Sequence, residues 1–220
     1  MPHYRQCLFD CKNNPMTTRA YSILLNLLFG IFGCRNVGQP KQDIDISALR
    51  VKAVEAKQYC KMKNLDQDFY LLIDLNRHSG LKRFYIWDFK RDQIESSFLV
   101  SHGCGAQPWG YDLSKESAVV SNVEDSHTSS IGRYIVTNRS YSNWGIHIKY
   151  IMIGQDPTNS NAVKRQIVLH SWESVADEEV YPAGTPEGWG CPAVSNNSML
   201  VIDRKLKSTN KEVLLWIIKS

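Results

Sequence analysis

The sequence predicts a mainly β domain with a two-sheet or barrel-like architecture and a few short helices. Apolar residues make up 43% of the 220-residue chain and charged residues 22%, which is enough apolar material for a buried core. From residue 68 onward, apolar side chains recur at every second position in several segments, as in half-buried strands. Many short strands separated by polar turns, with few helical periods between them, are typical of sandwiches and barrels.

The N-terminal segment has the order of features found in a signal peptide. Arg19 supplies a charged start, and the apolar run 21–33 follows it. That run is short for a bilayer span and fits a signal-peptide core. It ends at Gly33-Cys34, which resembles a bacterial lipoprotein signal with Cys34 as the lipidated residue. Cleavage without lipidation and a buried N-terminal helix are the alternatives.

These features divide the chain into three parts. Residues 1–34 are interpreted as a signal region whose true start is Met16. Residues 35–46 then form a tether, and residues 47–220 form a single catalytic domain with an N-terminal helix. The protein is therefore expected to be exported to the periplasm or cell envelope, and anchored to the membrane if its cysteine is acylated.

The domain is expected to begin with a helix capped by Ser47 that runs to about Met62. In the segment after it, Phe69, Leu71, Ile73 and Leu75 should share one strand face, and 68–90 should form a hairpin. Further strands are expected at 93–102, 117–122, 132–141, 144–154, 167–172 and 212–219, and helices from about Ser160 and from Asn197 to about Leu206.

Charge and histidine spacing point away from nucleic acid and from a metal centre. The net charge of +4 comes from scattered Lys and Arg residues, without the basic block that nucleic-acid binding favours. His102, Cys104 and His127 could hold a metal in principle, but their separations are not those of a zinc finger or a metalloprotease helix. No cofactor is expected.

Two cysteines are candidate nucleophiles, because each follows a glycine that lets the backbone approach a substrate closely. Cys104 has His102 two residues before it, in a strand-like segment. Cys191 follows His170 by 21 residues, across a loop rich in Pro and Gly. His170 lies at a strand end, which is a rigid place for a base, and Ser171 beside it could orient the imidazole through its carbonyl or hydroxyl. By itself this spacing is a moderate signal for Cys191. The alternatives are Cys104 as the nucleophile and a buried, structural His170 with an inert Cys191.

The segments "IVLHSW" (167–172) and "GWGCPAV" (188–194) resemble the catalytic signature of the YkuD-type murein L,D-transpeptidase family, in the branch with a Trp-Gly-Cys-Pro-Ala nucleophile motif. The resemblance covers roughly residues 68–206. Its other ordered matches are Ser101-His102-Gly103, Ser121-Asn122, Ser129-Ser130-Ile131-Gly132 with Tyr134, and Asn159, Asn161, Ala162 and Arg165. The chain departs from the pattern at Gly188, which replaces a serine, and at Trp189, where many relatives have a second histidine.

The resemblance implies a site as well as a fold. It makes Cys191 the nucleophile, His170 the base and Ser171 the orienting residue, with the N–H groups of Gly190 and Cys191 as oxyanion donors. Candidate substrate contacts are Ser101, His102, Trp189, Arg133 and Arg165. For the two arginines, which could bind carboxylates, ordinary surface charge is the alternative.

The implied activity is acyl transfer on peptidoglycan stem peptides through a Cys191 thioester, in an exported cysteine L,D-transpeptidase. Two alternatives remain at this stage. One is an L,D-carboxypeptidase or thiol peptide hydrolase, and the other is a non-catalytic, envelope-anchored module that binds peptidoglycan.

Overall fold

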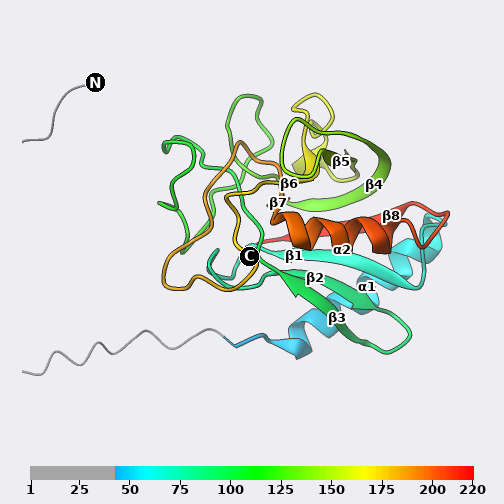
Figure 1. Cartoon of the computed structure of the whole chain (residues 1–220). Helices are drawn as coiled ribbons and strands as arrows, with labels where there is room; N and C mark the ends of the chain where they lie inside the picture. The colour runs from blue at the N-terminus through cyan, green and yellow to red at the C-terminus, as the bar shows by residue number, and fades with distance from the viewer. Residues whose placement is uncertain (1–42) are drawn as a thin grey trace, which may run out of the picture. The chain divides into compact units, whose positions relative to one another are not determined.

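The computed structural model describes residues 43–220, which fold around one curved β-sheet flanked by two helices (Figure 1). The predicted signal region and most of the predicted tether lie outside the described residues. The strands are β1 (Phe69–Asp74), β2 (Phe84–Asp88), β3 (Gln93–Phe98), β4 (Gly132–Tyr141), β5 (Ile148–Gly154), β6 (Val168–Ser171), β7 (Ala193–Val194) and β8 (Val213–Ile218). The helices are α1 (Ile46–Met62), α2 (Asn196–Leu206) and the short 3₁₀ helix η1 (Pro157–Asn159).

All eight strands belong to a single sheet in the order β3-β2-β1-β8-β4-β5-β6-β7. The predicted hairpin of residues 68–90 is confirmed, because β1 and β2 pair antiparallel. Most neighbours are antiparallel, while β1–β8 and β6–β7 are parallel. The mainly β, barrel-like prediction is therefore confirmed, in the form of one continuous sheet.

Strand β1 is buried on both faces, and its two faces serve two different cores. Phe69, Leu71 and Ile73 belong to the larger core, which α2 covers. Tyr70 and Leu72 point to the opposite face, where α1 packs. The period of two follows from the pleat of a strand, and it explains why nearly every residue of this central strand is apolar.

The two edges of the sheet approach each other through the chain that follows β3. Ser101 N–H donates to the carbonyl of Ala193, the first residue of β7, at 2.8 Å. Gly103 and Gly188 form a further parallel bridge. These bonds nearly close the sheet into a barrel, and they join the segment around Ser101 to the segment around residue 190.

Helix α2 is tied to the sheet by a polar contact at its buried side. Asp203 accepts hydrogen bonds from Arg139 Nε at 2.6 Å and from Tyr150 Oη at 2.7 Å. These partners lie on β4 and β5, so one carboxylate links α2 to two strands. Asp203 is only 7% exposed, and its two partners compensate the loss of hydration.

Several expected elements differ in detail from the structure. Strand β3 ends at Phe98 and β5 begins at Ile148, so both are shorter than the strands expected over 93–102 and 144–154. Asp45, and not Ser47, caps α1 by accepting the N–H of Ala48. The strand expected over 117–122 is reduced to one bridge between Val120 and Ser129, since the chain here runs as a loop. The helix expected from about Ser160 is the single turn η1, which begins at a proline and ends before that serine.

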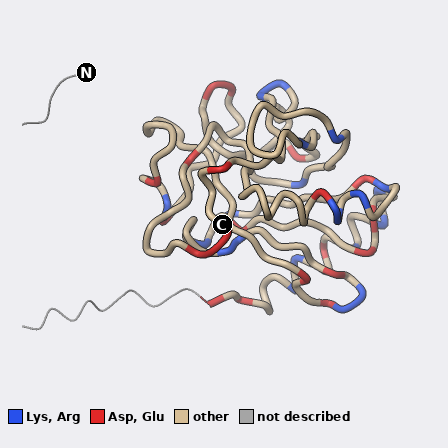
Figure 2. The backbone as a smooth tube through the Cα atoms, in the orientation of Figure 1, with Lys and Arg blue, Asp and Glu red and all other residues tan. Residues whose placement is uncertain are grey.

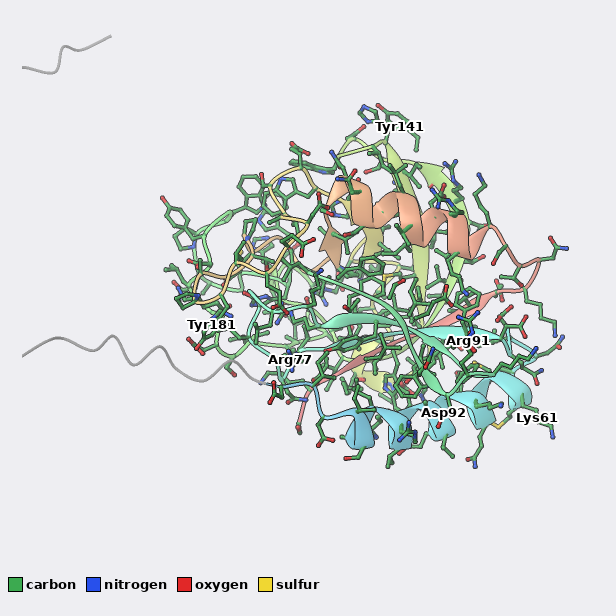
Figure 3. The ribbon with its side chains drawn as sticks, turned by 60° about the horizontal axis from the view of Figure 1, so that its bottom comes forward. Lys61, Arg77, Arg91, Asp92, Tyr141 and Tyr181 are labelled. Atoms are coloured by element: carbon green, nitrogen blue, oxygen red, sulfur yellow. The ribbon has the colours of Figure 1, made fainter. Side chains whose placement is uncertain are left out.

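Charged residues of both signs are interspersed along the described chain (Figure 2). One ion pair joins α1 to the turn between β2 and β3: Arg50 Nε and Asp92 Oδ2 are 2.6 Å apart. Figure 3 labels Asp92 near α1. Both side chains are about half exposed, so the pair contributes at most about 1 kcal/mol. Packing of the apolar faces, more than such pairs, holds α1 on the sheet.

Replacing Asp203 by alanine should lower the free energy of unfolding by about 2 kcal/mol, because it removes charge-assisted bonds and leaves the buried Tyr150 hydroxyl without its acceptor. Urea unfolding followed by circular dichroism would measure this. Glu212→Ala, at an exposed carboxylate, is the matched control and should change the free energy by less than about 0.5 kcal/mol.

The contribution of Asp203 to the free energy of unfolding should depend on pH. Burial raises the pKa of Asp203, but the bonds from Arg139 and Tyr150 outweigh it, so the pKa is lowered in the folded state. The stabilisation is therefore present above about pH 4 and is lost as the pH falls through the lower folded pKa. A stability gap between wild type and Asp203→Ala that grew on acidification would contradict this account.

Candidate active site

His170 lies in β6, at the end of a short apolar run that fixes its backbone between two strands. Its Cα is opposite Lys149 of β5 on one side and Ala193 of β7 on the other. The ring Nδ1 is 2.9 Å from the carbonyl oxygen of Ser171. A carbonyl can only accept, so Nδ1 carries the proton and Nε2 is the unprotonated nitrogen of the neutral ring.

Cys191 lies two residues before β7, and the parallel pairing of β6 with β7 brings it to the same side as His170. Its sulfur accepts the N–H of Val168 at 3.4 Å, and the thiol faces the carbonyl of Gln166 at 3.7 Å. The side chain is half-buried, whereas Cys60 and Cys104 are buried. Among the cysteines of residues 43–220, Cys191 alone is therefore open to a substrate.

The residue before Cys191 has to be glycine. Gly190 has a φ of +103°, in the region that other residues rarely adopt. A Cβ atom there would also lie 2.3 Å from the carbonyl oxygen of Thr128. The unusual backbone is held from behind by Ser129, whose hydroxyl donates to the Gly190 carbonyl at 3.1 Å and accepts the N–H of Gly103 at 3.2 Å.

The "SHGCG" segment is hydrogen-bonded to the loop that precedes Cys191. Gly188 N–H donates to the His102 carbonyl, and Cys104 N–H donates to the Gly188 carbonyl, both at 2.8 Å. The N–H groups of Gly190 and Cys191 donate to no acceptor within residues 43–220. Two adjacent free N–H groups beside a thiol can stabilise an oxyanion, provided that a carbonyl group binds there.

A cleft with about 490 Å³ of empty space opens at Cys191 and His170. Its other walls are aromatic: Trp109, Trp144 and Trp172 cluster together, with Trp109 and Trp172 stacked at 4.9 Å between ring centroids. A second cavity, with about 1280 Å³ of empty space, reaches the same cysteine and histidine from the side of β5. The thiol can therefore be approached from two directions.

A comparison with protein families identifies the domain that contains this site. Residues 40–216 match the L,D-transpeptidase catalytic domain. The chain belongs to the L,D-transpeptidase catalytic domain family. The match covers most of the chain and includes both His170 and Cys191. A comparison with curated proteins finds no match.

Three solved structures are similar to part of the chain. They are the helical cell shape determining protein Pgp2 from Campylobacter jejuni (13% identity, 70% of this chain and 49% of that chain, TM-score 0.43), the Ldtfm-avibactam carbamoyl enzyme (11%, 70% and 50%, 0.40) and Bd1075 from Bdellovibrio bacteriovorus (15%, 71% and 49%, 0.37). The present chain spans about half the length of each of these proteins.

Within this L,D-transpeptidase domain, Ser101 and Trp189 line the cleft beside Cys191, whereas Ser171, the residue after the histidine, is fully buried and does not line it. Trp189 is 62% exposed and stacks on His127, with ring centroids 5.1 Å apart. Ser171 accepts the N–H of Ile146 with its hydroxyl, so its carbonyl is the group that orients His170.

His102 is enclosed behind the cleft and does not line it. Its side chain is fully buried, with Nδ1 2.8 Å from Arg83 Nη2 and Nε2 2.9 Å from Ser114 Oγ. Burial and the neighbouring guanidinium lower the pKa of His102 to about 3, so the ring is neutral. Glu187, also buried, accepts the Ser114 N–H at 2.6 Å. The expected contact between His102 and substrate is replaced by a role within this polar network.

The two arginines also bind protein groups. Arg133 pairs with Asp156 and lies over the ring of Tyr59, on the α1 side of the sheet and away from the cleft. Arg165 lines the second cavity, but its guanidinium donates to the carbonyls of Ser121 and Thr128 at 2.9 and 2.6 Å. Both arginines therefore brace the fold, and neither is a free surface charge.

Sequence reasoning missed Lys149 and the tryptophan walls of the cleft. Lys149 is half-buried and lines the second cavity, and its Cα is the register partner of His170. For Trp109 the available signal was its place in a predicted loop, where a large exposed aromatic side chain needs a reason. Trp144 begins the strand expected over 144–154, so the sequence offered no such signal for it. No group of three metal-binding side chains converges anywhere in residues 43–220.

The pKa shifts of His170 and Cys191 favour the uncharged form of both side chains. Burial lowers the pKa of His170, although the Ser171 carbonyl opposes the shift. Burial raises the pKa of Cys191, although the N–H of Val168 and the charge of Lys149 oppose it. At neutral pH the resting site therefore holds a thiol and a neutral imidazole.

Alkylation of the native protein by iodoacetamide should test this resting state. The rate at Cys191 should rise by about tenfold per pH unit between about pH 6 and pH 9, because only the thiolate reacts and its pKa is raised. Mass spectrometry of peptides would report the rate at each cysteine. Cys60 and Cys104 should react only after unfolding. A plateau at Cys191 below pH 7 would instead indicate a preformed thiolate–imidazolium pair.

Proposed function

We propose that this chain is an exported L,D-transpeptidase that uses Cys191 as nucleophile and His170 as base on peptidoglycan stem peptides. The observation that supports it most directly is the shared cleft. It contains one accessible thiol, a histidine whose free Nε2 is set by the Ser171 carbonyl, and two N–H groups without acceptors in the described structure. Membership of the L,D-transpeptidase catalytic domain family supplies the substrate class.

In the first half of the proposed reaction, Nε2 of His170 takes the thiol proton as the sulfur attacks the carbonyl on the L-centre of a diaminopimelate residue. The S–C bond forms, and the negative charge moves to the carbonyl oxygen, where the Gly190 and Cys191 N–H groups would stabilise it. The C–N bond to D-alanine then breaks, and His170 returns its proton to the leaving amine. A thioester at Cys191 remains.

In the second half, an amine of a neighbouring stem attacks the thioester and gives its proton to His170. The S–C bond breaks, and the regenerated thiol receives that proton. Two cavities meet at Cys191, which suits an enzyme that must admit an acyl donor and an amine acceptor. Attack by water at the same thioester would instead release a shortened peptide, as in a carboxypeptidase.

The proposal assigns substrate contacts to Ser101 and Trp189, which line the cleft at either side of Gly188. The missing serine at position 188 removes a hydroxyl from the motif, but Gly188 is held by two backbone bonds to the "SHGCG" segment. The second motif histidine is replaced by Trp189, so His170 would have to act as base without help from that position. These contacts support a catalytic site more than a passive binding module.

Export is part of the proposal. The charged start, apolar run and Gly33-Cys34 exit support a signal region over residues 1–34, with lipidation or cleavage near Cys34. Among the described residues, no helix is long and apolar enough to cross a bilayer. A lipid at Cys34 would attach the domain to the membrane on the side that holds the cell wall.

The activity can be tested by incubating the domain with muropeptides that carry tetrapeptide stems and separating the products by chromatography. Wild type should form cross-linked dimers. Cys191→Ala and His170→Ala should each lower the rate by at least about 10³-fold, since either change removes a group that acts in both half-reactions.

Cys104→Ala is the matched control, and it should change the rate by no more than about threefold because Cys104 is buried outside the cleft. Tripeptides without dimers would identify a carboxypeptidase. No product from wild type would favour the non-catalytic module, and a loss confined to Cys104→Ala would overturn the assignment of the nucleophile.

Mass spectrometry of the protein recovered from a bacterial envelope tests export. The expected mature chain begins at or close to Cys34, and it carries the added mass of a lipid if the lipoprotein interpretation holds. A Cys34→Ser variant should then lose the lipid and leave the membrane fraction. An intact chain beginning at Met1, without lipid, would refute the proposed signal region.

A further inference from the structure

The larger cavity has an uncompensated positive charge. Two cationic side chains line it, Lys149 and Arg165, and no Asp or Glu lines it. The guanidinium of Arg165 donates to the carbonyls of Ser121 and Thr128 and is engaged with the protein. The ammonium of Lys149 has no hydrogen-bond or ion-pair partner among the described residues. A charge of this kind in a half-buried position favours an anionic ligand.

Lys149 also lies close to the reacting atoms. Its Cα is the register partner of His170 in the antiparallel pair of β5 and β6, so the two side chains leave the same face of the sheet. Side chains directly opposite each other in such a pair have Cβ atoms about 5 Å apart. Burial sets the direction of both pKa shifts, downward for His170 and upward for Cys191, and the charge of Lys149 acts in the lowering direction on each group, as a neighbouring cation should.

We propose that Lys149 is the anchor for a carboxylate of the substrate, namely the terminal carboxylate of the residue that leaves when Cys191 attacks. The inference rests on the proposed function. In a tetrapeptide stem, only one N–Cα unit separates the attacked carbonyl from the terminal carboxylate. A cation beside His170 is placed to hold that carboxylate while the carbonyl lies at the sulfur.

This assignment gives Lys149 a role in specificity. A stem extended by one more residue has an uncharged amide where the shorter stem has its terminal carboxylate. Such a substrate would leave the lysine unpaired in the cavity, at a cost in affinity and rate. The enzyme should therefore prefer peptides that end one residue beyond the attacked carbonyl.

The experiment compares a tetrapeptide stem that ends in a free carboxylate with the same stem ending in an amide, in a cycle with Lys149→Met. Wild type should prefer the acid to the amide by about tenfold in kcat/KM. Lys149→Met should lose about tenfold on the acid and less than about twofold on the amide, because the partner charge is already absent there. Lys149→Arg should retain the preference.

Lys90→Met is the matched control. Lys90 is an exposed lysine in the turn between β2 and β3, on the opposite side of the sheet order from β5. It should leave both rates unchanged. Equal losses of kcat/KM on the acid and the amide in Lys149→Met would mean that the lysine acts only through its electrostatic effect on Cys191 and His170. That outcome, or no loss on either substrate, would overturn the proposal.

Binding measurements distinguish a failure of the Lys149 proposal from a failure of the transpeptidase proposal. The affinities of the acid and the amide would also be measured calorimetrically on Cys191→Ala, with and without Lys149→Met, where no turnover is needed. Absence of turnover in wild type would refute the transpeptidase proposal, while an acid preference that disappears with Lys149→Met would still support the anchor. Equal binding of acid and amide by Cys191→Ala would refute the anchor.

Discussion

A buried guanidinium constrains the part of the fold on which the site is built. Arg83 is fully buried, and although burial lowers its pKa to about 10, it is charged at neutral pH. An unpaired charge in that position would cost several kcal/mol, so the chain must supply acceptors. It does so with the carbonyls of Val100 and Arg77 and with Nδ1 of His102. The segment that follows β3 is thereby fixed from the inside.

That fixed segment determines the backbone of the loop that precedes Cys191. The loop before Cys191 has no helix of its own, and it takes its conformation from bonds to residues 101–104 and from the Ser129 hydroxyl, which links Gly103 to Gly190. An oxyanion site works only if its donors are held before the reaction begins. A continuous series of contacts therefore links the buried guanidinium of Arg83 to the N–H groups of Gly190 and Cys191.

The sequence predicts the features that depend on local patterns of residues. It does not predict side-chain positions that depend on how distant strands pair. The period of two correctly identified the residues on one face of β1. The resemblance to the family motif predicted that His170 and Cys191 lie together, and both line one cleft. The same alternation could not tell that Lys149 would lie opposite His170, because the pairing of β5 with β6 is set by the fold. His102 was misplaced for a related reason: β3 ends at Phe98, and the residues beyond it turn inward to Arg83.

The position of Lys149 also bears on how the proposed reaction would be driven. Transfer of a proton from Cys191 to His170 creates a thiolate and an imidazolium beside each other. A cation near both stabilises the first and destabilises the second, so its effects on the pair largely cancel. Lys149 alone would then do little to ionise the empty site, which agrees with a resting thiol and neutral imidazole. Its field becomes unbalanced only when the negative charge leaves the sulfur for the carbonyl oxygen of a bound substrate. A carboxylate that neutralises the lysine would remove its field from the thiolate and the imidazolium together, so the role proposed for Lys149 is to position the substrate and not to ionise Cys191.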